Sequence, residues 1–186
     1  MTGKEQTPSD PFSHLGRPSS AGQSGPAENV CGDFDIRIAR DGTWFYHGSP
    51  IGRKPLVRLF ASVLRREGED FLLVTPVERG RIVVDDAPFT AVELDVEGGG
   101  RDQALRFRTN LDDEVVADAA HPIRVVHDAD TAEPSPYIEI RNGLEARIVR
   151  SVYYQLVELG EERRVGGEDL FGVWSKGQFF ALGRLG

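Results

Sequence analysis

The same succession of sequence patterns occurs twice in this chain, about 100 residues apart, and this repeat limits the folds that the chain can adopt. Each copy begins with alternating apolar and polar residues, turns at Asp41-Gly42 or Asn142-Gly143, returns as a second apolar run and continues into an amphipathic helix. Both dipeptides favour the two-residue turns of β-hairpins. The pattern predicts an α+β fold of mostly antiparallel strands with two helices, in which a hairpin-helix-hairpin motif is duplicated.

The spacing of apolar residues places the two helices. Leu56, Leu59, Phe60, Val63 and Leu64 form one stripe and predict a helix over residues 55–66, which Gly68 would end. A second stripe predicts a helix over 150–160, with Ser151 as a candidate for its cap. Apolar runs at 71–75 and 82–84 follow the first helix, and runs at 171–174 and 179–182 follow the second.

A second reading of the strands is compatible with the repeat. Runs near residues 82, 89, 105, 115, 124, 138 and 146 would give seven antiparallel strands, capped by the helix at 150. This is the plan of a pleckstrin-homology-like barrel. We therefore expect an N-terminal α+β repeat over 31–84 and a C-terminal pleckstrin-homology-like repeat over 85–186.

Residues 1–30 differ in texture from the rest of the chain. Gly, Pro and Ser supply 13 of these 30 residues. Such a segment cannot bury enough apolar surface to offset the entropy lost when it becomes ordered. We expect a disordered leader. It holds two basic and three acidic residues, so the remainder keeps 20 basic and 27 acidic residues of the 22 and 30 in the whole chain.

This acidic balance argues against nucleic acid or an anionic membrane surface as the main partner, since either needs a basic face. No apolar run approaches the roughly 20 residues that span a bilayer. The single cysteine, Cys31, excludes an intrachain disulfide and favours a cytoplasmic location. The oligomeric state stays open.

Catalytic and metal-binding patterns are weak. The run Gly22–Gly25 lacks the spacing of a nucleophile elbow, and the pairs Asp85-Asp86 and Asp112-Asp113 lie at expected turns, where aspartate binds its own backbone. His121, His127, Asp128 and Asp130 could meet at a metal, but a polar loop is the simpler interpretation. We therefore predict no metal, no cofactor and no catalytic residue.

Several longer runs resemble the proteobacterial domain-of-unknown-function family 1285. They include DGTWFYHGSPIGRKPLVRLFASVLRREGEDFLLVTPVE at 41–78, YIEIRNGLEARIVRSVYY at 137–154 and GVWSKGQFFALG at 172–183. The resemblance covers residues 33–183. It implies a duplicated core, a C-terminal half superficially like pleckstrin-homology folds, no established activity, and a suggested ligand site between the halves with a role in signal transduction.

Polar residues at strand ends, together with two tryptophans at similar-looking hairpins, are the candidates for such an interdomain groove. They are Trp44, Thr75, Glu78, Arg79, Thr109, Asn110, Arg141 and Trp174. We expect a non-enzymatic module that binds a small molecule or a protein partner. The alternatives are a hydrolase or small-molecule transferase in the same cleft, and a structural scaffold with a large apolar surface.

Overall fold

The computed structural model describes residues 31–186, and the expected leader lies outside the described residues. The N-terminal half holds one helix and one six-stranded sheet in the order β3-β2-β1-β6-β5-β4. Its elements are β1 (Cys31–Ile38), β2 (Trp44–Tyr46), β3 (Ser49–Pro50), α1 (Lys54–Ser62), β4 (Leu64–Glu67), β5 (Asp70–Val74) and β6 (Arg79–Val84).

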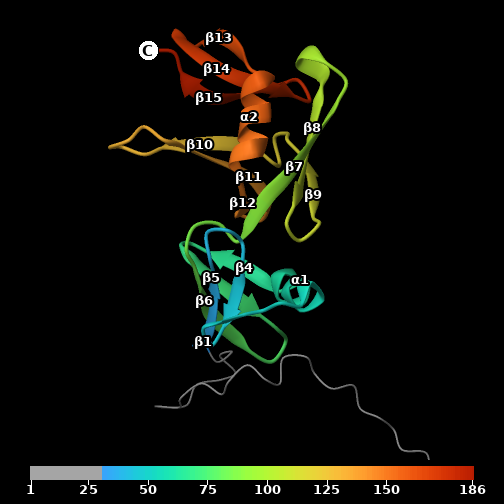
Figure 1. Ribbon diagram of the computed structural model, residues 1–186, viewed down its shortest axis with the longest axis vertical. Coiled ribbons are helices and arrows are strands. Elements are labelled where there is room, and N and C mark those ends of the chain that lie inside the picture. The colour runs from blue at the N-terminus through green and yellow to red at the C-terminus, as the bar shows by residue number, and fades with distance from the viewer. Residues whose placement is uncertain (1–30) are drawn as a thin grey trace, which may run out of the picture.

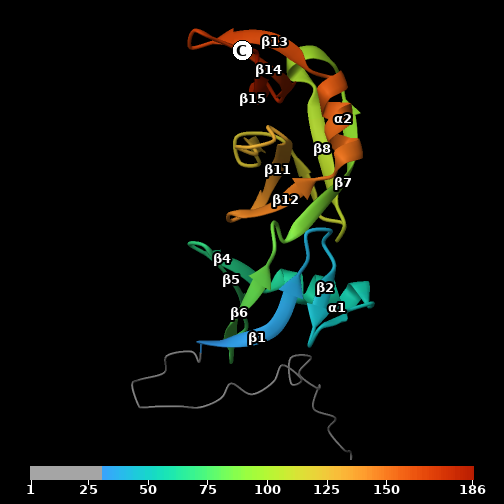
Figure 2. The same ribbon diagram turned by 60° about the vertical axis from the view of Figure 1, so that its left-hand side comes forward.

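The C-terminal half sits above the N-terminal half in Figures 1 and 2 and is built from two sheets. The larger has the order β10-β11-β12-β7-β8-β9, and the smaller is β13-β14-β15. The elements are β7 (Phe89–Glu97), a 3₁₀ helix (Gly100–Asp102), β8 (Ala104–Thr109), β9 (Glu114–Val116), β10 (Ile123–His127), β11 (Pro134–Arg141), β12 (Leu144–Ile148), α2 (Arg150–Glu158), β13 (Glu161–Val165), β14 (Glu168–Ser175) and β15 (Gln178–Arg184).

The two sheets of the C-terminal half curl into a barrel-like shape. The Ser175 hydroxyl of β14 accepts the backbone N–H of Leu105 in β8 at 3.0 Å, and Gln103 Nε2 donates to the carbonyl of Trp174 at 2.9 Å. At the other edge β15 lies against β10, while α2 packs on β7 and β14. This confirms the predicted α+β fold with two helices, mostly antiparallel strands and a barrel-like C-terminal half.

The duplication is visible as one order of elements. In each half a hairpin (β1–β2 or β11–β12) leads to a nine-residue helix and then to a three-stranded antiparallel meander (β4–β6 or β13–β15). The halves differ in what the hairpin pairs with. Strand β1 pairs in parallel with β6 of its own meander, whereas β12 pairs in parallel with β7.

The predicted end of the first helix was wrong. Helix α1 stops at Ser62, and 64–67 form strand β4. Leu64 is fully buried, as the stripe required, but it is buried opposite Leu73 in a hairpin whose turn holds Gly68 at a φ of 62°. Strand pairing with β5 therefore overrides the helical spacing of the last two apolar residues.

The cap and length of the second helix also differ from the prediction. Helix α2 ends at Glu158, and its N-cap position is Val149, without a side-chain hydrogen bond. Ser151 therefore lies inside the helix. Strand β13 was missed because its residues are mostly charged and exposed, which leaves no apolar alternation to detect.

The buried apolar side chains of the two halves form one continuous cluster. Trp44 and Phe60 stack in the N-terminal part with ring centroids 6.3 Å apart, and Phe89 and Phe107 are fully buried in the C-terminal part. The two halves therefore share one hydrophobic core.

Candidate functional site

The two halves meet where α1 faces the β8–β9 turn and the β11–β12 hairpin. Arg141, at the end of β11, donates from Nη2 to the carbonyl of Ala61 in the last turn of α1 at 2.8 Å. The same guanidinium reaches Asp113 at 3.4 Å and lies 5.1 Å from the ring centroid of Phe89. A cation from one half therefore binds the C-terminal end of a helix in the other, where the helix dipole favours positive charge.

Two loop contacts complete the boundary. Asn110 Nδ2 is 3.4 Å from the carbonyl of Gly42 in the β1–β2 turn, and Asn110 Oδ1 accepts the N–H of Thr90. Arg66 of β4 donates to the carbonyl of Gly143 at 3.0 Å. Both predicted hairpin turns, Asp41-Gly42 and Asn142-Gly143, thus sit at the boundary between the halves.

A groove of about 340 Å³ lies along this boundary. It is lined by side chains of α1 on one side and by the β8–β9 turn and the end of β11 on the other. The lining residues are Arg58, Ala61, Ser62, Leu111, Asp113 and Arg141. Two guanidinium groups from opposite halves therefore share a cavity with one carboxylate and a small apolar surface.

The rim of the groove carries a network of charges centred on Asp112. Its carboxylate accepts hydrogen bonds from Lys54 at 2.9 Å and from Arg108 at 3.0 Å, and Arg58 lies 3.5 Å away. The pKa of Asp112 is lowered, chiefly by the hydrogen bond from Lys54 and next by the positive charges of the neighbouring side chains. Asp112 is thus held as an anion that orders the cations beside it.

Three of the eight residues predicted for an interdomain groove lie at this boundary. Arg141 lines the groove, and Asn110 bridges the two halves. The fully buried Thr109 accepts the backbone N–H groups of Leu111 and Asp113, which shapes the turn that supplies the groove wall.

Thr75, Glu78 and Arg79 lie within the N-terminal half, at the turn before β6. Thr75 and Glu78 bond to each other across the turn at 3.0 Å, and Arg79 pairs with Glu67 at 2.6 Å. Within residues 31–186, these hydrogen bonds and the ion pair all stay inside the N-terminal half.

The two tryptophans are far from each other in the fold. Trp44 is buried in the N-terminal core, and its indole N–H has no hydrogen-bond partner among the described residues. Trp174 belongs to β14, donates to Glu161 at 2.6 Å and lies under the guanidinium of Arg163 at 4.4 Å. Trp44 lies in the hairpin before α1, whereas Trp174 lies in the meander after α2. They therefore occupy different places in the repeat and do not share one interface.

Sequence reasoning missed Arg58 and Ser62, and it interpreted Asp113 as a turn residue alone. Arg58 sits on the polar face of an amphipathic helix, where a cation signals solvent exposure as readily as a site. The pair Asp112-Asp113 was a signal that could have indicated the site. These two acidic residues follow Asn110 in the turn after β8, and this is the turn that faces α1.

The candidate metal cluster does not form. His121 Nδ1 contacts the carbonyl of Glu139 at 3.1 Å, and Asp128 accepts the N–H groups of Asp130 and Thr131 in its own loop. Among residues 31–186 no three His, Cys, Asp or Glu side chains are arranged to hold a metal ion. Within the same part of the chain, neither helix has the length and apolar character needed to cross a membrane.

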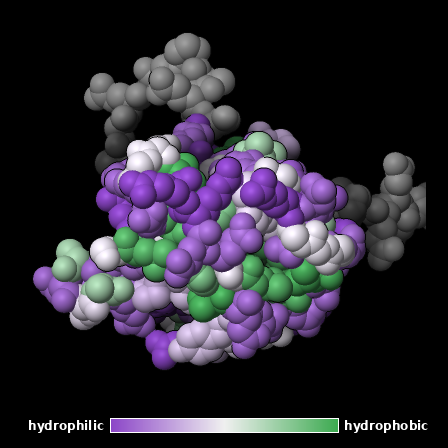
Figure 3. All heavy atoms as spheres, turned by 90° about the horizontal axis from the view of Figure 1, so that it is seen from above, coloured by the Kyte–Doolittle hydropathy of each residue, from purple (hydrophilic) through white to green (hydrophobic). Residues whose placement is uncertain are grey.

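A scaffold role would need a large, continuous apolar surface. Figure 3 looks onto the end of the C-terminal half and shows apolar areas separated by hydrophilic side chains. The exposed apolar residues of that half include Val157, Leu159, Val165 and Leu185. On this face the apolar surface is divided.

Comparison with known families and structures agrees with this architecture. The model of the N-terminal domain of the family of unknown function DUF1285 matches residues 26–87, and the model of its C-terminal domain matches residues 88–182. The change from one model to the other falls in the connection between β6 and β7. A search of curated proteins gives no match.

Two crystal structures of this family are similar to the chain. A DUF1285 family protein from Silicibacter pomeroyi DSS-3 is 49% identical, with a TM-score of 0.78 over 88% of this chain and 91% of that one. One from Shewanella baltica OS155 is 28% identical, with a TM-score of 0.51 over 65% of this chain and 88% of that one. With both family models and a close structural relative covering the two halves, the chain belongs to the DUF1285 family, whose function is unknown.

Proposed function

We propose that the protein is a non-enzymatic binding module whose interdomain groove takes a small carboxylate that also carries a hydrogen-bond donor, such as a free amino acid. The observation that carries the proposal is that Arg58 and Arg141, one from each half, line the same groove. This places two positive charges together in a chain whose net charge is -8. Guanidinium groups bind carboxylates with two parallel hydrogen bonds.

Arg58 is the group available to the ligand. Its side chain is 56% exposed, and its ion pair with Asp112 is 3.5 Å long. Arg141 is already engaged by Ala61 and Asp113, so it positions the wall and adds charge. Asp113 accepts a ligand ammonium or hydroxyl group, while Ala61 and Leu111 contact a short carbon chain. A ligand held this way bridges the halves.

The alternative function is a hydrolase or transferase acting in the same groove. Such an enzyme needs a nucleophile beside a base. The one hydroxyl among the groove-lining residues given above, that of Ser62, donates to the carbonyl of Leu59 at 2.6 Å, and these residues include no histidine or cysteine. The lining therefore favours binding over catalysis. A cytoplasmic location and a role in signalling are part of the same proposal.

A thermal-shift screen of the full chain with the free amino acids tests the proposal. A ligand that binds the native state alone raises its stability by about 2.7 kcal/mol at 100 times Kd, so the shift must grow with concentration. Arg58→Met should abolish the shift. Arg164→Met is the matched control, because Arg164 is exposed and 3.9 Å from Asp169, away from the groove. If no amino acid shifts the wild type, or if Arg58→Met responds as the wild type does, the proposed function is wrong.

A further inference from the structure

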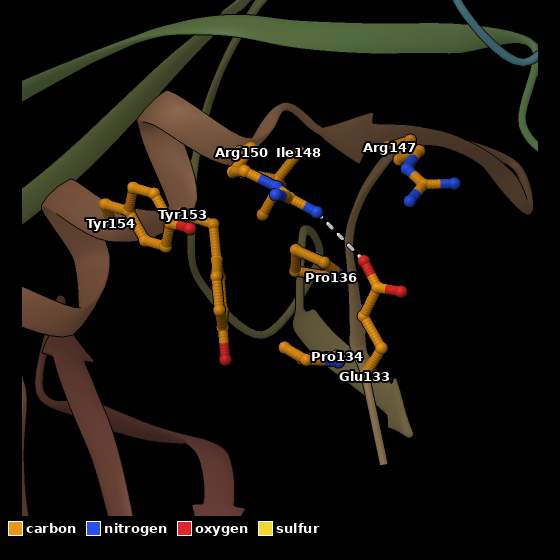
Figure 4. Close-up of a pocket in the computed structure, with 8 residues that line it drawn as sticks. All are labelled: Glu133, Pro134, Pro136, Arg147, Ile148, Arg150, Tyr153 and Tyr154. Carbon is orange, nitrogen blue, oxygen red and sulfur yellow. Dashed lines mark hydrogen bonds and ion pairs between the residues drawn. The ribbon is translucent and has the colours of Figure 1, made fainter. Parts of the chain in front are cut away.

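A second cavity, of about 460 Å³, lies within the C-terminal half (Figure 4). It is bounded by Glu133 and the start of β11, by the end of β12 and by the first turn and a half of α2. We call it the tyrosine–arginine cleft. Its lining residues are Glu133, Pro134, Pro136, Arg147, Ile148, Arg150, Tyr153 and Tyr154.

The inner walls of the cleft are flat and mostly apolar. Figure 4 shows the ring of Tyr153 across from Pro134 and Pro136. Ile148 is buried and Tyr153 is half-buried, whereas Tyr154 is exposed at the rim. Partial burial raises the pKa of Tyr153, so its hydroxyl stays protonated and can donate a hydrogen bond. A ring-shaped ligand would stack against such surfaces in the offset manner of aromatic pairs.

The two arginines of the cleft are held very differently. Arg147 pairs with Asp86 at 2.6 Å, the side chains are 20% and 18% exposed, and Tyr137 donates to the same carboxylate at 2.7 Å. Arg150 pairs with Glu133 at 3.0 Å, but these side chains are 73% and 61% exposed. Solvent-exposed pairs contribute little to stability. Arg150 can therefore exchange Glu133 for the anionic group of a ligand, while Arg147 stays in place.

The volume and lining match those of small-molecule sites, which are mostly apolar with a few convergent polar groups. The repeat adds a parallel. Helices α1 and α2 both have nine residues, and Tyr154 holds in α2 the position that Arg58 holds in α1. The interdomain groove is lined by the second half of α1, whereas the cleft is lined by the first half of α2, and the cleft is the more aromatic of the two cavities.

We propose that the tyrosine–arginine cleft binds small aromatic carboxylates, with the ring between Tyr153 and the two prolines and the carboxylate on Arg150. This site is separate from the interdomain groove and does not depend on the function proposed for it. The ligand class follows from the flat apolar walls, which favour a ring, and from the exchangeable cation at the rim, which favours a single negative charge.

Binding of 2-naphthoate to the full chain, followed by the fluorescence of the ligand, tests this proposal. The uncharged 2-naphthamide serves as the charge control and should bind at least about tenfold more weakly, since a hydrogen bond to a charged group is lost. Arg150→Met should weaken 2-naphthoate binding by about the same factor, and Tyr153→Leu by roughly threefold to tenfold.

A variant that should gain affinity makes the test sharper. Glu133→Gln removes the carboxylate that competes for Arg150, so 2-naphthoate should bind several-fold more tightly. Arg58→Met should leave binding unchanged, because Arg58 belongs to the interdomain groove. Thermal unfolding of each variant checks that the fold is intact.

Three results would overturn the proposal. The first is equal binding of 2-naphthoate and 2-naphthamide, and the second is Arg150→Met and Glu133→Gln variants that both bind like the wild type. The third is loss of binding in Arg58→Met, which would place the ligand between the halves.

Discussion

Arg141 joins the two halves, and replacing it with methionine should lower the free energy of unfolding by about 3 kcal/mol. The bond to the carbonyl of Ala61 involves a charged donor and is worth about 2 kcal/mol. The longer, half-exposed contact with Asp113 adds about 0.5 kcal/mol, and the position over the ring of Phe89 adds about 0.5 kcal/mol. Methionine keeps most of the apolar stem, so the loss reports on the guanidinium.

Urea unfolding followed by tryptophan fluorescence measures this loss. We expect one transition in both proteins, with an unchanged slope, because the buried cluster crosses both halves. The melting temperature should fall by about 9 °C for a domain of this size. Arg164→Met, which removes an exposed arginine 3.9 Å from its partner, should change stability by at most about 0.5 kcal/mol. A loss below about 1 kcal/mol for Arg141→Met would refute the view that this residue joins the halves.

Three further predictions concern the boundary between the halves. Gly42→Ala should lower stability in thermal unfolding more than Gly68→Ala does. Both glycines have a positive φ, but a Cβ at Gly42 would come 2.7 Å from Asn110 Nδ2, whereas a Cβ at Gly68 would meet nothing within 4 Å. Equal losses of stability would contradict the close approach at Gly42. The pKa of Asp112 is lowered in the folded state, so the ionised carboxylate stabilises the fold above the ordinary value of 3.8, and this stabilisation is lost as the pH falls through and below that value. As the pH falls over that range, urea unfolding should show a smaller loss of stability for Asp112→Asn than for the wild type. Parallel curves of stability against pH would contradict this. Thr109→Val removes the acceptor of two backbone N–H groups in a buried turn and should cost about 2 kcal/mol in urea unfolding; a loss under about 0.5 kcal/mol would show that the turn does not need the hydroxyl.

Part of the candidate site could be predicted because it depends on local chemistry. Thr109 and Asn110 end a strand that the alternation predicts, and Arg141 precedes the Asn142-Gly143 turn, so all three were recognised as polar residues at strand ends. Nothing local distinguishes them from Thr75, Glu78 and Arg79, which also end or begin strands. The difference is which strand ends face the other half.

The tyrosine–arginine cleft shows the same limit. Large aromatic side chains such as those of Tyr153 and Tyr154 are buried by default, so the sequence does not mark them as residues of a cleft. Their neighbours in the cleft, Pro134 and Pro136, lie in β11, although proline in a sequence more often indicates a loop or the edge of a sheet. The cleft is formed where the β11–β12 hairpin and α2 come together in the fold, which no window of sequence describes.

The sequence by itself determined the hairpin turns, the two helix starts, the hairpin-then-helix order in each repeat and the acidic character of the chain. These follow from short-range effects: φ preferences at Asn142 and Gly143, which take 48° and 75°, and the period of apolar residues. Tertiary structure alone decided that β4 is a strand, that β1 pairs with β6 but β12 with β7, and that Arg58 meets Arg141 across a groove. Those outcomes depend on contacts between residues far apart in the chain, whose free energy exceeds the local preferences they override.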